Sequence, residues 1–386
     1  MTRILLAAAF VCVMGHAQAE TIIVSDEAAL AEAITTAEPG DRILIAPGEY
    51  GGGMHFRDIT GEPEHPIVIA GADPDDPPVF VGGGNGMQFS NIAHVTLQDI
   101  HFTGASGNGL NIDDGGTFDT PSHHVTLRRL TIRDVGPEGN RDGIKLSGVQ
   151  DFRVEDCVIE YWGSAGQGVD MVGCHDGVIT GCEIRHEPAA QTAGIQAKGG
   201  CRDIVIRNNY IEGSARGVNI GGSTGLQFFR PEPRGYEAKA ITVEGNVFSR
   251  NQAPVAYVGV DGAIVRHNTI HHPGRWALRI LQETTEDGFV PSRNGEFTDN
   301  IIVFHSEDWA SGGVNIGPHT APETFTFARN AWYCMDNPEA SAPSLPTAET
   351  DAVIGEDPLL TDPANGDFSL QPESPAQGKG HTAFED

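Results

Sequence analysis

Residues 204–211 read Ile-Val-Ile-Arg-Asn-Asn-Tyr-Ile, and this short pattern decides how the chain folds. Its order is apolar, any residue, apolar, two further residues, Asn, any residue and apolar. The same order returns as Ile-Thr-Val-Glu-Gly-Asn-Val-Phe at 241–248 and, with Cys in place of Asn, as Phe-Arg-Val-Glu-Asp-Cys-Val-Ile at 152–159. Because apolar and polar residues alternate, each copy predicts strand with one face buried. A period of two excludes helical repeats.

The sixth position of this pattern recurs along most of the chain, at Ile100, Leu130, Cys157, Cys182, Asn209, Asn246, Asn268, Asn300 and Asn330. The steps run from 22 residues (246 to 268) to 37 residues (209 to 246), which suits one coil of a solenoid. Asn tolerates a left-handed backbone and can bond the same residue one coil along. It should therefore mark the bend between two short strands.

A second strand precedes each of these pairs and has the form Gly-apolar-x-apolar, as in Gly-Ile-Gln-Ala at 194–197 and Gly-Val-Asn-Ile at 217–220. Each coil then holds a Gly-led strand, a turn and the Asn-centred pair. The prediction is an all-β, single-domain parallel β-helix, right-handed because crossovers between parallel strands are right-handed.

The two ends of the chain depart from the repeat. Residues 1–19 hold one Arg, an apolar run over 4–14 and the ending Ala-Gln-Ala, which predicts a cleaved signal peptide. Residues 26–36 predict a short capping helix that starts at Asp26. The β-helix with this cap should cover 20–337. Residues 338–386 should form a Pro- and Ala-rich segment, loose over 338–350, and a tail that covers the other end.

The charge balance bears on where the protein acts and on what. The chain has 24 Lys+Arg against 53 Asp+Glu, a formal net charge of −29, which argues against nucleic acid or an anionic membrane as partner. No later apolar run is long enough to span a bilayer. We therefore expect a secreted or periplasmic protein, monomeric because both solenoid ends are capped.

Two pairs of cysteines share register positions on neighbouring coils, Cys157 with Cys182 and Cys174 with Cys201. Neighbouring strands lie roughly 4.8 Å apart, within the reach of a disulfide. Buried thiol ladders that fill the core are an equally good interpretation, and no cysteine spacing predicts zinc.

Outward positions of a β-helix stack into columns. The third residues of the Gly-led strands form one such column: Gln88, Asn111, Lys145, Asp170, Gln196, Asn219, Tyr257, Arg279 and Asn315. The next column is Ser90, Asp113, Ser147, Val172, Lys198 and Gly221, and the strand entrances include Asn108, Asp142, Gln167, Arg216 and Trp276. Water alone could explain polar residues here. However, four of the scarce cations, Lys145, Lys198, Arg216 and Arg279, gather on this face.

At the level of these repeats, nearly the whole mature chain resembles the pectate-lyase-like superfamily, and within it the chondroitinase B-like and alginate lyases. The resemblance implies an acidic polysaccharide as partner and its cleavage by β-elimination. A Lys base and an Arg on the next coil carry that reaction in the family, and Lys198 and Arg216 match these parts, with Lys145 as a further cation. Asn111, Asp113, Asp170, Gln196, Asn219 and Arg279 would then bind substrate. An insertion at 223–239 would wall the groove through Phe229 and Tyr236, unless it is a plain packing loop.

The same family often uses Ca²⁺ to neutralise the uronate carboxylate. Its closely spaced Glu pair ahead of the Lys is missing from this chain, where Gln196 stands at the comparable place. Calcium, if bound, would fall to Asp142 and Asp170. No other cofactor is predicted.

Three other functions fit the same sequence. A uronate C5-epimerase begins with the same proton abstraction and would share nearly every residue. A glycoside hydrolase would need two carboxylates that face one gap, for which Asp142 and Asp170 are candidates. A non-catalytic carbohydrate-binding β-helix is also permitted, because a fold alone does not fix a function.

Overall fold

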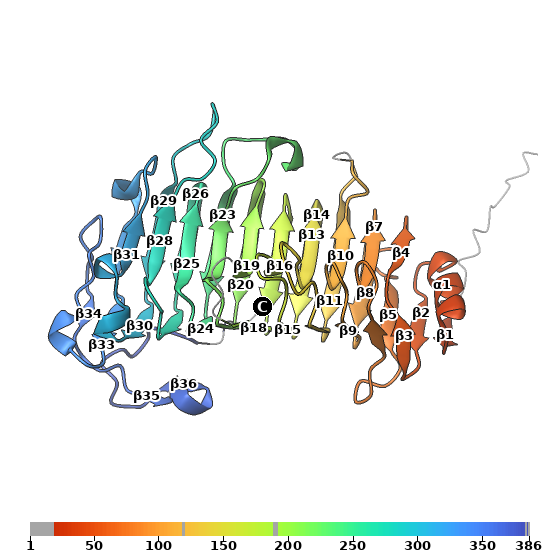
Figure 1. Ribbon diagram of the computed structural model, residues 1–386, viewed down its shortest axis with the longest axis horizontal. Helices are drawn as coiled ribbons and strands as arrows, with labels where there is room; N and C mark the ends of the chain where they lie inside the picture. Colours follow the sequence, from red (N-terminus) through yellow and green to blue (C-terminus); the bar gives the residue numbers. More distant parts are fainter. Residues whose placement is uncertain (1–18, 118–119, 188–191, 383, 385–386) are drawn as a thin grey trace, which may run out of the picture.

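The computed structural model describes residues 19–117, 120–187, 192–382 and 384, and it forms one long stack of coils (Figure 1). Three parallel sheets run along the stack. Sheet 1 contains β1 (Thr21–Val24), β2 (Arg42–Ile45), β5 (Ile67–Gly71), β8 (Ala93–Gln98), β11 (Ser122–Arg128), β14 (Val149–Glu155), β17 (His175–Thr180), β20 (Cys201–Arg207), β23 (Ala238–Glu244), β26 (Val260–Arg266), β29 (Arg293–Thr298) and β32 (Thr326–Ala328).

Sheet 2 contains β3 (Glu49–Gly51), β6 (Val79–Val81), β9 (His101–Thr103), β12 (Thr131–Arg133), β15 (Val158–Glu160), β18 (Glu183–Arg185), β21 (Tyr210–Glu212), β24 (Val247–Ser249), β27 (Thr269–His271), β30 (Ile301–Phe304), β33 (Ala331–Cys334) and β34 (Val353–Ile354). Sheet 3 contains β4 (Met54–Arg57), β7 (Met87–Ser90), β10 (Leu110–Asp113), β13 (Ile144–Ser147), β16 (Gln167–Val172), β19 (Ala193–Lys198), β22 (Arg216–Gly221), β25 (Ala253–Val258), β28 (Leu278–Leu281) and β31 (Val314–Ile316).

The coils follow the predicted order, with a strand in sheet 3 that is Gly-led in most coils, then a strand in sheet 1, then a strand in sheet 2. The alternating apolar residues point inward and form one continuous core, in which Ile195, Val218 and Ile206 are fully buried. The predicted all-β parallel solenoid is confirmed.

The asparagines between sheets 1 and 2 form a buried ladder along the stack. The Asn209 N–H donates to Asn246 Oδ1 (3.0 Å), Asn246 N–H to Asn268 Oδ1 (3.0 Å), Asn268 N–H to Asn300 Oδ1 (3.0 Å) and Asn300 N–H to Asn330 Oδ1 (2.9 Å). These bonds satisfy polar groups that the bend would otherwise bury unpaired. The predicted bonds from Asn to Asn along the stack are present, but the left-handed backbone lies one residue earlier than predicted, as at Asn208, His267 and Asp299.

Replacing Asn268 with Ala should lower the free energy of unfolding by about 2 kcal/mol. The Asn268 amide also donates to the Val243 and Arg266 carbonyls (3.0 and 2.9 Å), so the change leaves several buried groups unpaired. Urea denaturation measures the loss. Asn365→Ala, at an exposed position, is the control and should change stability little. Equal stability of the two variants would contradict a stabilising ladder.

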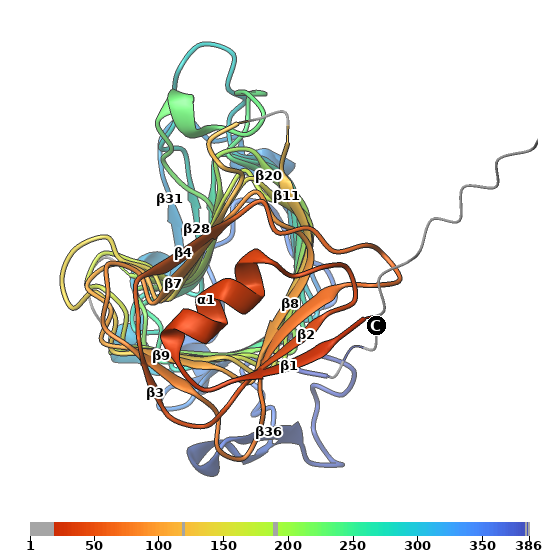
Figure 2. The same ribbon diagram turned by 90° about the vertical axis from the view of Figure 1, so that its right-hand side faces the viewer.

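A short helix covers the first end of the solenoid. Helix α1 (Glu27–Thr35) lies across the open end of the first coils (Figure 2) and buries Leu30 and Ile34. The Asp26 carboxylate accepts the Ala29 N–H at 2.9 Å and starts the helix. The predicted capping helix is therefore present.

At the other end, residues 338–350 are docked instead of loose. The Glu349 carboxylate accepts from Asn330 N–H (3.0 Å) and Trp332 Nε1 (2.8 Å), which closes the Asn ladder. The tail beyond them packs on sheet 2 rather than over the end. Its antiparallel pair, β35 (Leu360–Asp362) and β36 (Asp367–Leu370), lies beside the stack in Figures 1 and 2, and Phe368 contacts Tyr210.

Short 3-10 turns occur at η1 (Leu226–Phe228), η2 (Ser306–Asp308), η3 (Ser311–Gly313), η4 (Pro322–Thr324), η5 (Pro338–Ala340) and η6 (Pro363–Asn365). Residues 1–18, nearly all of the predicted signal peptide, lie outside the described residues. Among the described residues, no helix is long and apolar enough to cross a membrane.

The five described cysteines are free and buried, as in the thiol-ladder interpretation. Cys174 N–H donates to Cys201 Sγ at 3.2 Å, so the second pair does lie on neighbouring coils. Burial and the neighbouring thiol of Cys174 raise the pKa of Cys201, which keeps this thiol protonated and inert.

Candidate functional site

The outer face of sheet 3 carries the predicted polar column. Asn111 pairs in register with Lys145, Lys145 with Asp170, Asp170 with Gln196 and Gln196 with Asn219. The pairing of Val172 with Lys198 and of Ala193 with Arg216 likewise agrees with the predicted columns.

The prediction was wrong for Tyr257, which was placed in this column. Ala256 pairs with Asn219 instead, while Tyr257 points inward, is fully buried and donates its hydroxyl to the Glu296 carbonyl (2.7 Å). Strand β25 begins Ala-Pro-Val and lacks the leading Gly that marks the register of most other sheet-3 strands.

Two buried carboxylates and two lysines lie next to one another on this face. Asp170 is 0% and Asp142 2% exposed. The Lys145 ammonium contacts Asp170 Oδ2 directly and lies 3.5 Å from Asp142 Oδ2. Lys198 Nζ lies 3.5 Å from Asp170 Oδ1. Because buried charges need partners, these four side chains compensate one another.

The carboxylates around Lys145 keep its side chain protonated, so Lys145 is not suited to act as a base. Burial lowers the pKa of Lys145, but the charges of Asp170 and Asp142 outweigh this effect and raise it overall. Lys145 therefore stays an ammonium and holds the two carboxylates. Burial and then the charge of Asp170 raise the pKa of Asp142 to about 6, with Lys145 partly offsetting them.

The Asp142 shift predicts a pH-dependent stability. Its ordinary pKa is 3.8 and its folded pKa about 6, so between these values the folded state holds a proton that the unfolded state has lost. The stabilising contribution of Asp142 to the free energy of unfolding is complete below pH 3.8 and is lost as the pH rises through 6. Asp142→Asn should therefore gain stability relative to the parent protein across this window, by up to about 3 kcal/mol. Denaturation series at pH 4 to 7 measure it, and a pH-independent difference would contradict the shift.

Beside this cluster, two arginines line a pocket of about 220 Å³ together with Gln196, Asn219 and Trp276. Arg216 Nη1 donates to Asn219 Oδ1 (2.9 Å) and Arg216 Nη2 to Glu283 Oε1 (3.1 Å). Arg279 donates to Asn315 Oδ1 (3.0 Å) and lies over the Trp276 ring, 4.8 Å from its centroid. The pocket is therefore held in shape by hydrogen bonds and a ring contact.

The two arginines make the pocket electropositive. Burial, and then the positive charge of Arg216, lower the pKa of Arg279. Like charges crowd here although the whole chain is strongly acidic. An anionic group in the pocket would relieve this repulsion, and the Glu283 carboxylate already shows how Arg216 holds one.

Lys198 lies at the edge of this pocket, because its ammonium donates to Gln196 Oε1 at 3.3 Å. The structure thus brings together Lys198, Arg216, Gln196, Asn219 and Arg279, from β19, β22 and β28. Two predicted substrate-binding residues lie elsewhere. Asn111 and Asp113 sit on β10, three coils from β19, where Asn111 Nδ2 donates to Asp113 Oδ2 (2.9 Å).

The insertion between β22 and β23 differs from the prediction at Phe229. This ring is fully buried and lies edge-to-face against Phe289 at 5.5 Å, so it cannot stack on a sugar. Phe289 belongs to the loop between β28 and β29, which rises beside the insertion (Figure 1). Tyr236 is 9% exposed and lines a different pocket with His175 and Arg230.

Sequence reasoning also missed Glu237, which anchors the insertion. Glu237 is fully buried and accepts from the Gly199 N–H (2.8 Å) and the Thr224 hydroxyl (2.7 Å) and from the Thr284 hydroxyl. Its partners come from three separate segments. The pattern of the chain around Glu237 holds no signal for them.

The residues named for calcium do not fit it. A calcium site needs several oxygen ligands turned toward one point. Here the Lys145 ammonium lies between the Asp142 and Asp170 carboxylates and neutralises them. No chemical step is therefore derived through a metal at this place.

The coil architecture and its stacked polar face define a parallel β-helix protein. The family model described as right handed beta helix region matches residues 85–230 and 116–285, which together span just over half of the 386 residues. The chain belongs to this right-handed β-helix family. No curated protein sequence matches it.

Several solved structures are similar to the chain at low identity. Pectate lyase Pel9A is 13% identical with a TM-score of 0.53, over 81% of this chain and 80% of that one. The alginate lyase from Paenibacillus sp. strain FPU-7 is 20% identical with a TM-score of 0.49, over 78% of this chain and 96% of that one. A rhamnogalacturonan lyase is 13% identical with a TM-score of 0.46, over 81% and 87%. At 13% identity and a TM-score of 0.53, the likeness to pectate lyase Pel9A shows the fold alone.

Proposed function

We propose that the protein is a polysaccharide lyase that binds a uronate-containing chain along sheet 3 and cleaves it by β-elimination. The observation that carries this proposal is the crowding of Arg216 and Arg279 in one pocket with Lys198 at its edge. A carboxylate that recurs along a sugar chain is the substrate feature that such a pocket suits. The polysaccharide lyases among the similar folds agree with this choice of substrate class.

The proposed reaction uses these side chains as follows. Arg216 and Arg279 bind the uronate carboxylate, and Gln196 and Asn219 orient the ring by hydrogen bonds. Lys198 must first release a proton from the ammonium that faces Asp170, and its amine nitrogen then takes the C5 proton. The electron pair of the broken C5–H bond forms the C4–C5 double bond while the C4–O bond breaks. The leaving glycosidic oxygen takes a proton from water, and Lys198 returns its proton to water. Positive charge aimed at the carboxylate stabilises the enolate that develops before the bond breaks.

The location proposed for this activity is outside the cytoplasm. Residues 1–19 have the charge, apolar core and small-residue ending of an export signal, and external polysaccharides are met only there. N-terminal sequencing of the protein recovered from the periplasm or medium tests this proposal. A product that still begins at Met1 would contradict it.

The purified protein should raise the ultraviolet absorbance of at least one uronate polymer in a panel of alginate, polygalacturonate, chondroitin sulfate, dermatan sulfate and polyglucuronate. The rise reports the new double bond. It should be equal with added calcium and with EDTA, because Lys145 already neutralises the two carboxylates. Loss of activity in EDTA would contradict this expectation and would indicate that Ca²⁺ binds at Asp142 and Asp170.

The same panel separates the alternatives. A flat trace with new reducing ends would indicate a glycoside hydrolase and direct attention to Asp142 and Asp170. A flat trace with exchange of the C5 proton for solvent deuterium would indicate an epimerase. Binding without any product would indicate a carbohydrate-binding β-helix, and each of these results would overturn the lyase proposal.

A further inference from the structure

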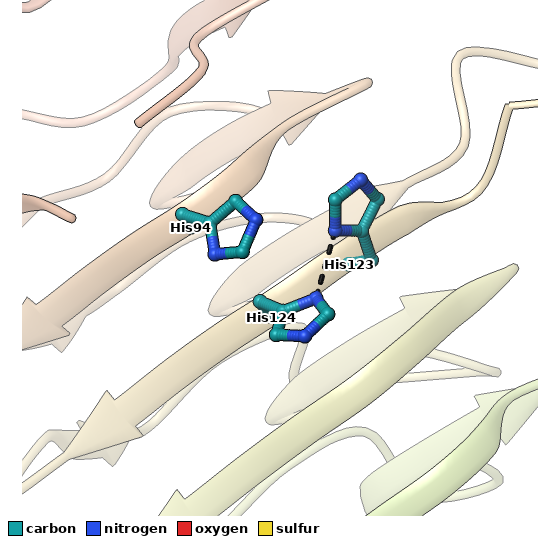
Figure 3. Close-up of side chains that lie close together, drawn as sticks. All are labelled: His94, His123 and His124. Carbon is teal, nitrogen blue, oxygen red and sulfur yellow. Dashed lines mark hydrogen bonds between the residues drawn. The ribbon is translucent and has the colours of Figure 1, made fainter. Parts of the chain in front are cut away.

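Three histidines lie together on sheet 1, away from the pocket on sheet 3 (Figure 3). They are His94 on β8 and His123 and His124 on β11. One ring nitrogen of each lies within 4.8 Å of the others. His94 stacks on His124 with 4.4 Å between ring centroids, and His123 meets both rings edge-on.

The β-helix itself brings these side chains together. Register pairs His123 with Ala93 and Val125 with Val95, so His94 and His124 occupy equivalent positions between these two pairs on neighbouring strands. Both have left-handed backbones, with φ of 52° and 53°. The same position on the next coils holds Asp151, Asp176 and Asp203, also with positive φ. The fold therefore stacks whatever polar residues occupy this column.

The donor atoms match a small ion of borderline softness. Imidazole nitrogens suit zinc, copper, nickel and cobalt, whereas calcium and magnesium prefer oxygen. His123 Nδ1 and His124 Nδ1 lie 2.9 Å apart. Two nitrogens bound to one tetrahedral Zn²⁺ at about 2.0–2.1 Å are roughly 3.3 Å apart. A small rotation of either ring supplies that difference.

One further feature favours a metal. The Asp151 carboxylate lies 3.9 Å from His124 Nδ1 and is half exposed, so it can turn toward an ion held by the rings.

We propose that His94, His123 and His124 bind one divalent transition-metal ion of the zinc type, with Asp151 as the fourth ligand. The ion would join two neighbouring coils, β8 and β11, with the third coil contributing through β14. The site is distinct from the proposed lyase pocket and does not depend on it.

Binding of Zn²⁺ and Co²⁺ to the protein, prepared without a polyhistidine tag and stripped with a chelator, tests this proposal. Calorimetry should find one ion per chain, and Co²⁺ should show the intense visible bands of a tetrahedral complex. Zn²⁺ should also raise the Tm, because it binds only the folded state. His94→Asn, His123→Ala and His124→Asn should each weaken binding by more than about tenfold.

The substitutions are chosen so that folding is preserved. Asn accepts the left-handed backbone at positions 94 and 124. His272→Asn is the matched control, because His272 has φ 52° and stacks on His305 yet lies outside the cluster. It should bind metal like the parent protein. Absence of saturable binding in the parent, unchanged binding in all three cluster variants, or loss of binding in His272→Asn would each overturn the proposal.

Discussion

Arg216→Ala is expected to lower kcat/KM on the cleaved polysaccharide by roughly 10²–10³-fold, since removing one preorganised donor to a developing oxyanion costs about that much. Arg216 reaches the pocket from the entrance of β22, fixed by Asn219 and Glu283. In the proposed reaction it meets the carboxylate whose charge grows as the C5 proton leaves. The rate of double-bond formation measures the loss, and Arg216→Lys should recover only part because Lys offers a point charge.

The control for this result is Arg57→Ala. Arg57 is an exposed arginine on β4 of the same sheet, six strands from β22, and should leave kcat/KM unchanged. Equal Tm values of Arg216→Ala and the parent protein would show that the pocket variant is folded. A folded Arg216→Ala variant with full activity would contradict the proposed carboxylate contact.

The repeat was predictable because the residues that define it lie close together in sequence, within each coil. Alternating apolar residues and the Gly that leads most of the sheet-3 strands act within one coil. In stacked coils the outward columns follow from the repeat positions alone. The sequence therefore predicts that Lys198 and Arg216 lie on neighbouring strands, as they do. The error at Tyr257 arose where β25 lacks its Gly and the count slipped by one residue.

Contacts between segments far apart in sequence could not be predicted in this way. Phe229 is buried by Phe289 and Glu237 is bonded to Thr284, and no periodicity links either pair. The histidine cluster is an intermediate case. His94 and the pair His123-His124 both directly precede the apolar start of a repeat, at Val95 and Val125, so their register was visible. The left-handed backbone at His94 and His124, where the two rings stack, was not visible in the sequence.

The second large effect is expected at Lys145. Lys145→Met should lower the free energy of unfolding by about 3–5 kcal/mol at neutral pH, because it removes the partner of two buried carboxylates. Asp170 is fully buried and Asp142 nearly so, and neither can turn to water when the ammonium is gone. Lys198, at 3.5 Å from Asp170, is a more distant partner for that carboxylate alone. Urea denaturation at pH 7 measures the loss.

A second substitution and a change of pH separate this charge effect from lost packing. Lys145→Met combined with Asp170→Asn should recover most of the stability, since one buried charge disappears with its partner. The defect of the single variant should also shrink as the pH falls, because protonation of Asp142 removes one unpaired charge. Since Lys145 lowers the pKa of Asp142, the variant should take up this proton at a higher pH than the parent protein. Lys239→Met, at an exposed ion pair, is the matched control. Lys239 is 49% exposed and 3.6 Å from Asp261, so its loss should cost less than about 1 kcal/mol. If Lys145→Met costs no more than Lys239→Met at neutral pH, the two carboxylates do not depend on the ammonium, and Lys145 is free to act in the proposed reaction.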